Sequence, residues 1–324
     1  MKNYDLVIIG AGPAGLGCAI SATKRNMKLL LMDKGNIVNS IINFPTNMVF
    51  FSTTDVLELD NIPFNSREIR PNRVEAIKYY QSLSRHFNIP VKTNAMVNSI
   101  TKKEGIFRIT YLKSAKQFHI SSNAVVLATG FYDNPNLLGI PGEDMNHVSH
   151  YYKEAFQHYK QDVVVVGGKN SAVEAALDLH RHGARVTLIH RKSEIGESVK
   201  YWIMPDIMNR INEGSIITSL NTTVTEIMPD HIRVKDKNNQ KEIKADAVYL
   251  LTGYHPDTRL LKSCGVKFDL ETLESEIDQN SLESNVEKLF LAGSLVAGRN
   301  ANKIFIENSR EHGEKILTYL ESLL

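Results

Sequence analysis

The same structural unit occurs twice in this chain, and that duplication constrains the fold more than any other feature. Each copy has an apolar strand, a glycine-rich turn (residues 10–15 and 167–172), a helical stretch and a second strand. The second strand ends at Asp33 in the first copy and at His190 in the second, in each case 23 positions after the first glycine. A repeated strand–turn–helix–strand unit predicts two α/β domains, each built on a parallel sheet.

The second copy lies inside the first domain. Each copy ends in an apolar strand that runs into Thr-Gly, at residues 129–130 and 252–253. A further strand at 289–292 and an amphipathic helix from about Asn302 to the end would complete the first domain. We therefore predict two Rossmann-like, three-layer ββα dinucleotide-binding domains, the second inserted in the first. The expected bounds are residues 1–143 with 255–324, and residues 144–254.

Composition excludes several classes of partner. The 38 Lys and Arg residues nearly balance the 36 Asp and Glu residues, which argues against nucleic acid or an anionic membrane as partner. Apolar runs have the length of strands, and the N-terminus begins as a strand rather than as a signal peptide. Two cysteines, Cys18 and Cys264, make neither a disulfide framework nor a metal site. We expect a cytoplasmic protein that binds small molecules or another protein.

The first glycine turn is typical of a pyrophosphate site. Glycines allow the tight bend and let backbone N–H groups approach a pyrophosphate at the helix N-terminus. Asp33 stands where it can accept hydrogen bonds from both hydroxyls of an adenosine ribose, and its charge would repel a 2′-phosphate. The first site therefore suits FAD or NAD.

The second site has the opposite charge. At the position that matches Asp33 the chain has His190, Arg191 and Lys192, which suit the 2′-phosphate of NADPH. The alternative is a solvated basic loop, which the position at the end of the strand disfavours. Two such cofactors have complementary chemistry, because nicotinamide gives hydride and flavin accepts it. The helix expected near Asn302 could direct its positive end at the flavin, or serve only as a docking helix.

These features resemble the flavin-dependent pyridine-nucleotide oxidoreductases of thioredoxin reductase-like architecture, from Tyr4 to about Leu320. Within that group the chain resembles the YpdA-type proteins, which are similar to bacillithiol disulfide reductases. The stretches that carry the resemblance are residues 44–53, 167–172, 198–203 and 305–308.

The resemblance implies FAD, NADPH, a homodimer and two sets of binding residues. The FAD set is Gly10, Gly12, Pro13, Ala14, Gly15, Asp33, Lys34, Thr46, Val97, Ala128, Thr129, Gly130, Gly293, Ser294, Lys303 and Ile304. The NADPH set is Gly167, Gly168, Asn170, Ser171, Ala172, His190, Arg191, Lys192, Thr252 and Gly253. No metal site is implied.

Three positions depart from the relatives. Thioredoxin reductases carry a Cys-x-x-Cys pair where this chain has residues 147–152, so thioredoxin is not the expected substrate. YpdA-type proteins commonly have a cysteine at the position of Ala14, and the usual Gly-Asp contact to the flavin reads Gly293-Ser294. His150, Tyr151 and Tyr152 could stand near the flavin instead, although ordinary packing is the interpretation we favour.

The sequence thus predicts an enzyme, an NADPH-dependent FAD oxidoreductase that reduces a small acceptor such as bacillithiol disulfide. A reductase of ferredoxin or flavodoxin, which are small redox proteins, is one alternative. A redox sensor without turnover is another. We expect both cysteines to be structural, Cys18 buried on the first helix and Cys264 near the surface at a helix end.

Overall fold

The structure, a computed structural model, describes residues 2–196, 198–237 and 239–323. The chain forms two compact units. Unit 1 comprises Met1–Asn43, Met48–Asn134 and Tyr254–Leu324, and unit 2 comprises Phe44–Asn47 and Pro135–Gly253. The chain therefore leaves unit 1, completes most of unit 2 and returns, as the nested repeats predict.

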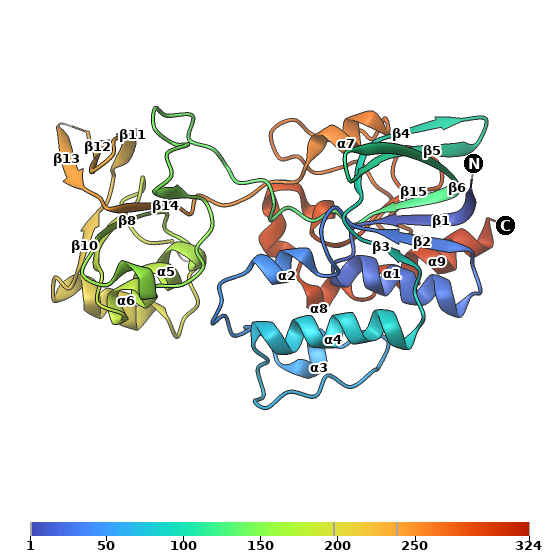
Figure 1. Ribbon diagram of the computed structural model, residues 1–324, viewed down its shortest axis with the longest axis horizontal. Helices are drawn as coiled ribbons and strands as arrows, with labels where there is room; N and C mark the ends of the chain where they lie inside the picture. The colour runs from blue at the N-terminus through green and yellow to red at the C-terminus, as the bar shows by residue number, and fades with distance from the viewer. Residues whose placement is uncertain (1, 197, 238, 324) are drawn as a thin grey trace. The chain divides into compact units, whose positions relative to one another are not determined.

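Unit 1 is built on a seven-stranded sheet with the strand order β3-β2-β1-β6-β5-β4, and β15 also pairs with β6. The parallel part contains β1 (Asn3–Ile9), β2 (Leu29–Met32), β3 (Val91–Lys92), β6 (Lys116–Leu127) and β15 (Leu289–Leu291). The antiparallel part contains β4 (Met96–Lys103) and β5 (Ile106–Lys113), which extend from β6. Figure 1 shows this antiparallel ribbon on one side of β1 and the helices α1 and α9 on the other.

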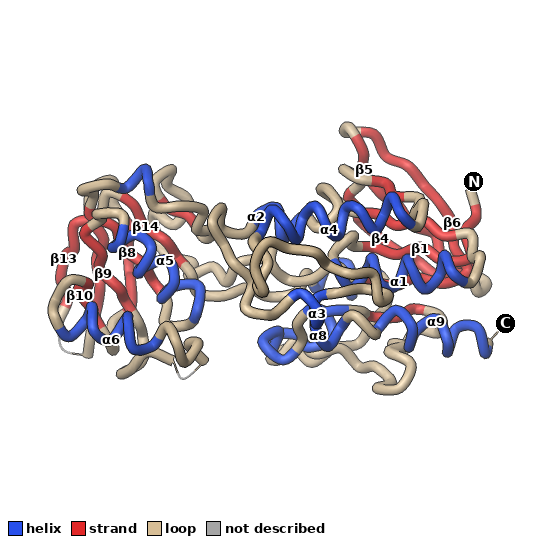
Figure 2. Tube along the Cα trace, turned by 90° about the horizontal axis from the view of Figure 1, so that it is seen from below, coloured by secondary structure: helices blue, strands red, loops and turns tan. Residues whose placement is uncertain are grey.

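In unit 1, the first helix and the last helix pack closely against each other. The helices of this unit are α1 (Pro13–Lys24), α2 (Asn39–Asn43), α3 (Thr54–Leu57), α4 (Arg73–His86), α7 (Thr258–Ser263), α8 (Ile306–Ser309) and α9 (His312–Ser322). A Cβ on Gly313 of α9 would lie 2.5 Å from the backbone carbon of Gly17 in α1. Only glycine permits this approach, which brings α1 and α9 side by side (Figure 2).

The C-terminal helix differs from the prediction. Residues 293–303 form 3₁₀ turns that break at Gly298, where φ is 53°. The four-residue α8 and then α9 follow, so the long helix begins at His312 rather than near Asn302. Gly298 precedes the expected start, so the difference lies in residues 304–305 and 310–311, which are not helical and separate the 3₁₀ turns, α8 and α9.

Unit 2 has three layers of its own. The central parallel sheet has the order β10-β9-β8-β14-β7, and a three-stranded antiparallel sheet has the order β11-β12-β13. The parallel strands are β7 (Val148–Ser149), β8 (Asp162–Val166), β9 (Arg185–Ile189), β10 (Ile216–Ser219) and β14 (Ala247–Leu250). The antiparallel strands are β11 (Thr223–Ile227), β12 (His231–Lys235) and β13 (Gln240–Lys244), and the helices are α5 (Asn170–Arg181) and α6 (Met204–Asn212). A single 3₁₀ turn lies at Phe156–His158. The ββα layering predicted from the sequence is confirmed.

Residues 135–143 lie in unit 2. The Ile227 N–H donates to the Pro141 carbonyl at 2.9 Å, and a Cβ on Gly142 would lie 2.0 Å from the Ile227 carbonyl oxygen. These contacts hold residues 135–143 against the end of β11. The chain returns to unit 1 at Tyr254.

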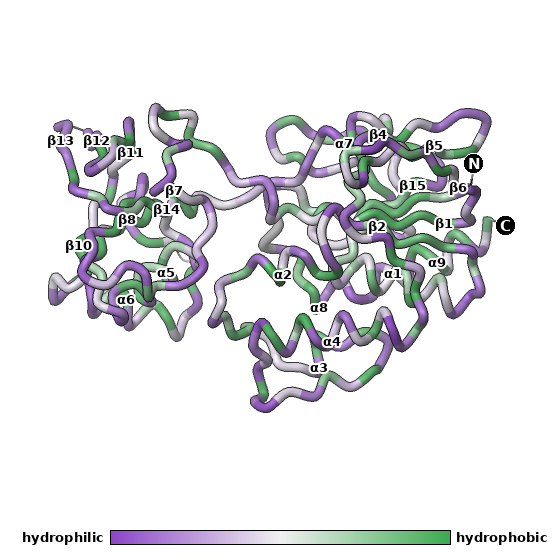
Figure 3. The backbone as a smooth tube through the Cα atoms, viewed as in Figure 1, coloured by the Kyte–Doolittle hydropathy of each residue, from purple (hydrophilic) through white to green (hydrophobic). Residues whose placement is uncertain are grey.

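The central strands β1 and β8 are apolar toward their C-terminal ends, and the hydropathy colouring in Figure 3 shows green segments there. Leu6, Val7 and Ile8 of β1 and Val164 and Val165 of β8 are fully buried. Parallel strands covered on both faces require such runs. Among the described residues, every helix is too short or too polar to span a bilayer.

Candidate functional site

The first glycine turn joins the C-terminal end of β1 to α1. A Cβ on Gly10 would lie 2.2 Å from the Ala128 carbonyl oxygen, and a Cβ on Gly15 would lie 1.8 Å from the Gly10 carbonyl oxygen. Gly10 and Gly15 are therefore required by the packing of the turn itself. No side chain caps α1, so the N–H groups of its first turn remain available.

Gly12 is different, because a Cβ on this residue would meet no protein atom within 4 Å. Its φ of −73° and ψ of 178° suit any residue. The fold therefore does not require glycine at position 12. An open space next to an uncapped helix N-terminus fits the approach of a pyrophosphate to the backbone, which is how dinucleotides are held in this kind of turn.

Asp33 lies at the end of β2, next to β1, and both of its carboxylate oxygens hold the turn. Oδ2 accepts a hydrogen bond from Ala11 N–H and Oδ1 accepts one from Gly35 N–H, each at 2.8 Å. Burial raises the pKa of Asp33, although these two backbone hydrogen bonds lower it. Each oxygen keeps a second lone pair, which fits an interaction with ribose hydroxyls.

Other predicted FAD residues follow β6 and β15 and lie close to the first glycine turn. A Cβ on Gly130 would lie 3.9 Å from Ser294 Oγ, and a Cβ on Gly293 would lie 2.9 Å from the Ala14 Cβ. The Ala128 N–H donates to the Ile9 carbonyl at 2.7 Å, which fixes the end of β6 beside β1. The carboxyl ends of neighbouring parallel strands thus converge on one edge of the sheet, where ligands bind in open α/β folds.

The remaining FAD candidates are less closely joined to the turn. Ala95 N–H donates to the Asp33 carbonyl at 2.8 Å, which brings the start of β4, and with it Val97, toward Asp33. Lys34 pairs with Asp133 at 3.0 Å. The Lys303 carbonyl accepts a hydrogen bond from Asn308 Nδ2 at 2.8 Å, so Lys303 and Ile304 lead directly into α8. Thr46 lies in unit 2, where its N–H donates to the Lys153 carbonyl.

The second glycine turn has the same construction between β8 and α5. Gly167 has a φ of 151°, and a Cβ there would lie 2.6 Å from the Leu251 carbonyl oxygen. Thr252 Oγ1 donates to the Asn136 carbonyl at 2.7 Å, which places the Thr252-Gly253 pair at the end of β14. No side chain caps α5, and Asn170, Ser171 and Ala172 form its first turn.

The basic loop that follows β9 lies against this turn. A Cβ on Gly168 would lie 2.5 Å from two ring atoms of His190. Burial, together with the charges of Arg191 and Lys192, lowers the pKa of His190, so its imidazole is neutral at pH 7. Arg191 and Lys192 are exposed, and neither forms an ion pair within the part of the chain that the structure describes. Among the residues that the structure describes, the loop thus offers two positive charges without an ion-pair partner.

Asn170 ties the same loop to α5, a role that the sequence did not indicate. Its Nδ2 donates to the Ser198 carbonyl at 2.9 Å and its Oδ1 accepts from Lys200 N–H at 2.9 Å. Gly196 N–H also donates to the Gly168 carbonyl at 2.9 Å. Residues of the loop are therefore positioned by hydrogen bonds to the glycine turn.

The residues that replace the missing dithiol have packing roles in unit 2. His150 Nε2 lies 3.5 Å from Glu143 Oε1, and the Tyr151 N–H donates to Ser149 Oγ at 3.1 Å. Tyr152 is buried, bonds to Asp178 and meets the Tyr249 ring edge-on. Burial, together with the hydrogen bond to Asp178, raises the pKa of Tyr152 far above its usual range. These contacts favour the packing interpretation.

Both thiols are buried. Cys18 is fully buried on α1, as predicted, and burial raises its pKa to about 12. Cys264 was expected near the surface, but its side chain belongs to the apolar core of unit 1, and its thiol donates to the Leu260 carbonyl at 3.0 Å. Burial raises the pKa of Cys264 to about 12 as well. Neither cysteine offers a thiolate at neutral pH.

His312 is a residue that sequence reasoning missed. Its Nδ1 accepts a hydrogen bond from Gly293 N–H at 3.1 Å, so this N–H is not available to a ligand. Burial, with a smaller contribution from Lys315, lowers the pKa of His312 to about 4.

We expect His312 to make the protein less stable as the pH falls. Its pKa is about 4 in the folded chain and 6.5 ordinarily, so the unfolded chain binds the proton first. The stabilisation, complete above pH 6.5, is then lost as the pH falls to 4, by about 2–3 kcal/mol. Urea denaturation across this range should show a flatter profile for His312→Gln, which keeps an acceptor for Gly293. Parallel profiles for the two proteins would contradict this role.

Comparisons with known proteins agree with this geometry. A family model described as pyridine nucleotide-disulphide oxidoreductase matches residues 7–293. The bacilliredoxin reductase Bdr of Bacillus subtilis (strain 168) is 40% identical over 319 residues, covering 98% of this chain and 97% of that protein.

Two solved structures are similar over the whole chain. The bacillithiol disulfide reductase Bdr (YpdA) from Bacillus cereus matches with a TM-score of 0.98 and 38% identity, covering 100% of both chains. The enzyme of the same name from Staphylococcus aureus matches with a TM-score of 0.95 and 36% identity, covering 100% of this chain and 99% of that one. Both glycine turns lie within the matched residues.

Proposed function

Because the chain belongs to the pyridine nucleotide-disulphide oxidoreductase family, we propose that it reduces a low-molecular-weight disulfide such as bacillithiol disulfide. The chain is an NADPH-dependent flavoprotein oxidoreductase of thioredoxin reductase-like architecture, and its cofactors are FAD and NADPH. The observation that carries the choice of acceptor is the full-length similarity to two solved bacillithiol disulfide reductases.

We assign FAD to unit 1 and NADPH to unit 2. The assignment is supported by charge, because Asp33 closes the first site, whereas Arg191 and Lys192 flank the second. The open space at Gly12 and the uncapped α1 would receive the FAD pyrophosphate. When bound, FAD supplies a carrier that takes two electrons from NADPH and passes them to the acceptor.

The net reaction requires no protein thiol. One NADPH, one proton and one disulfide give NADP⁺ and two thiols, so electrons, atoms and charge balance. Cys18 and Cys264 have pKa values near 12 and are buried, so neither can attack a disulfide as a thiolate. We therefore propose that the acceptor receives electrons directly from the flavin. We also propose that the protein is a cytoplasmic homodimer.

Reoxidation kinetics test the acceptor. The protein is reduced anaerobically with one equivalent of NADPH and mixed with bacillithiol disulfide, other small disulfides, quinones or ferredoxin, while flavin absorbance is followed. We expect bacillithiol disulfide to reoxidise the flavin fastest. Faster reoxidation by ferredoxin would instead make the protein an electron-transfer reductase, and no reoxidation by any acceptor would make it a sensor.

We expect a Cys18→Ala, Cys264→Ser variant to retain acceptor turnover within about threefold, since no thiol takes part. Alanine at 18 avoids burying an unpaired hydroxyl, and serine at 264 keeps a donor for the Leu260 carbonyl. Flavin content and NADPH-dependent flavin reduction are the controls. A loss of acceptor turnover by more than about 100-fold, with both controls unchanged, would make one of these thiols catalytic.

A further inference from the structure

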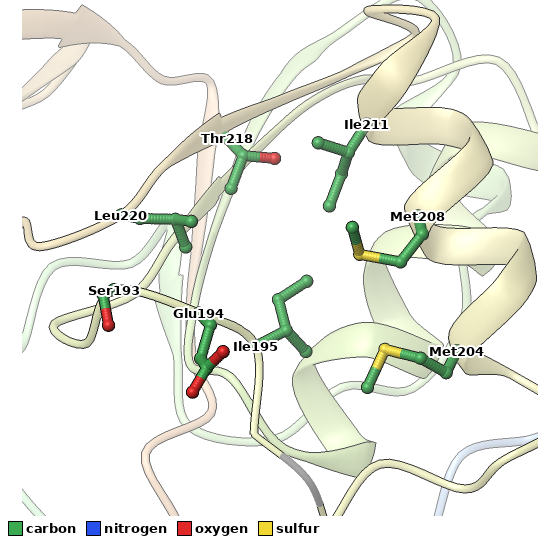
Figure 4. A pocket seen from close by; sticks show the side chains of 8 residues that line it. All are labelled: Ser193, Glu194, Ile195, Met204, Met208, Ile211, Thr218 and Leu220. Carbon is green, nitrogen blue, oxygen red and sulfur yellow. The ribbon is translucent and has the colours of Figure 1, made fainter.

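A crevice of about 690 Å³ in unit 2 adjoins the basic loop that follows β9. Figure 4 shows residues 193–195, side chains of α6 and the end of β10 around a common space. Residues 193–195 continue directly from Arg191 and Lys192, so the crevice belongs to the candidate NADPH site and is not a separate one. The feature that the two candidate sites leave unexplained lies in unit 1.

The strap, as we name the 3₁₀ segment Gly293–Lys303, leads from β15 to α8 in unit 1. It begins at the first glycine turn, where a Cβ on Gly293 would lie 2.9 Å from the Ala14 Cβ. It ends at Lys303, whose carbonyl accepts a hydrogen bond from Asn308 Nδ2 at 2.8 Å. The predicted FAD residues of this segment, Gly293, Ser294 and Lys303, therefore lie at its two ends. The middle of the strap has no place in the predicted FAD set.

The middle of the strap lies against a hairpin turn at residues 269–274. A Cβ on Gly298 would lie 2.4 Å from the Thr272 carbonyl oxygen, so only glycine permits this approach. The same carbonyl accepts a hydrogen bond from the Arg299 N–H at 2.7 Å. The backbone of the strap is therefore fixed to the turn at two consecutive residues.

A side-chain hydrogen bond adds to these backbone contacts. Asn300 Nδ2 donates to Glu274 Oε1 at 2.8 Å, and both side chains are half-buried. Glu274 forms no ion pair within the residues that the structure describes, so Asn300 is the polar partner of its carboxylate. A hydrogen bond to a carboxylate is stronger than one between two neutral groups. This bond therefore contributes substantially to holding the strap on the turn.

The turn is closed by hydrogen bonds of its own. Asp269 Oδ1 accepts hydrogen bonds from the Glu271 N–H at 2.9 Å and from the Thr272 N–H at 2.6 Å. The Leu273 N–H donates to the Asp269 carbonyl at 2.9 Å, and the Leu273 side chain is buried. Aspartate commonly closes turns in this way. The turn is thus a firm support for the strap, which consists of short 3₁₀ turns with weaker internal hydrogen bonds.

We propose that Glu274 and Asn300 are positioning residues for FAD. By holding the middle of the strap on the turn, they keep its two ends in place against the cofactor. The inference rests on the proposed function, because it takes FAD to bind in unit 1. Neither residue belongs to the predicted FAD set, so their effect on the cofactor passes through the strap. Breaking the bond should let FAD leave faster while the rest of unit 1 stays folded.

The test measures FAD release from the purified holoenzyme, as the flavin absorbance that stays with the protein during repeated buffer exchange. Asn300→Ala, Glu274→Ala and the double variant remove the bond, whereas Glu274→Gln keeps an acceptor for Asn300. Asn280→Ala is the matched control. Asn280 is exposed on the next turn of the same segment, and its side chain forms no hydrogen bond among the described residues. The melting temperature of each FAD-free protein reports on the fold.

We expect Asn300→Ala and Glu274→Ala each to release FAD about ten times faster than the unaltered protein. Glu274→Gln should stay within about threefold, and Asn280→Ala should change nothing. The double variant should release FAD no faster than either single variant, because all three lack the same bond.

An unchanged rate of FAD release in Asn300→Ala overturns the proposal, even if the melting temperature falls, because the bond would then support only the fold. Equal acceleration in Asn280→Ala overturns it as well. If Gly12→Val loses its flavin while Asn300→Ala retains it normally, the assignment of FAD to unit 1 stands and only the role of the strap fails.

Discussion

A Gly12→Val variant is expected to fold but to lose nearly all of its flavin. The valine side chain meets no protein atom at its Cβ, and the backbone of residue 12 is extended, so the fold tolerates the change. The side chain would occupy the space through which the pyrophosphate reaches the turn. We expect FAD affinity to fall by at least about 100-fold, or ~2.7 kcal/mol. The ratio of flavin to protein absorbance after purification measures it.

Two alanine substitutions give the matched controls. Gly12→Ala adds a smaller group and should lose less flavin than Gly12→Val. Gly15→Ala places a Cβ 1.8 Å from the Gly10 carbonyl oxygen, so it should lower the melting temperature of the protein even when FAD is added in excess. Full flavin occupancy in Gly12→Val would mean that FAD lies elsewhere.

An Arg191→Ala variant is expected to lose most of its preference for NADPH over NADH. The Arg191 guanidinium is exposed and forms no ion pair among the described residues, so it is available for the 2′-phosphate. Charge-assisted hydrogen bonds contribute roughly 1.5–3 kcal/mol, which is about 10- to 100-fold in NADPH affinity. NADH lacks the phosphate, so its affinity should change little. Calorimetric titrations with the two nucleotides give the ratio.

Arg181 provides the control for the loss of a positive charge. It lies on α5 in the same unit and pairs with Asp206. Arg181→Ala removes the same charge from unit 2 at the other end of the helix, and it should leave the NADPH to NADH ratio unchanged. An equal loss in both variants would attribute the preference to net charge rather than to a phosphate contact.

The sequence predicted the fold where the determining residues are close together. Both glycine turns and their strands follow from local patterns, and the nested order follows from the repetition of the same unit along the chain. The position of residues 135–143 depends instead on Ile227, more than 80 residues away, and on hydrogen bonds that leave no local pattern. The division of the expected C-terminal helix into α8 and α9 was missed because residues 304–305 and 310–311 contain no glycine or proline that would mark a break.

Residues of the candidate site could be predicted where they stand at a fixed distance in the sequence from a glycine turn. Asp33 and the His190–Lys192 loop follow strands at a fixed distance from a glycine turn, and the structure places them beside the turns. His312 could not be found this way, because nothing in its neighbourhood indicates that it bonds to Gly293. The bond between Asn300 and Glu274 was equally hidden, since the two residues are 26 positions apart and no local pattern links them.

The nested arrangement of the two units also sets the order in which the molecule can be completed during synthesis. Every strand and helix of unit 2 precedes Tyr254, so this unit can fold while the ribosome is still adding the last segment. Unit 1 begins first but finishes last, because β15 and α9 come from the end of the chain and α1 packs directly on α9. The newborn protein therefore completes unit 2, to which we assign NADPH, before unit 1, to which we assign FAD.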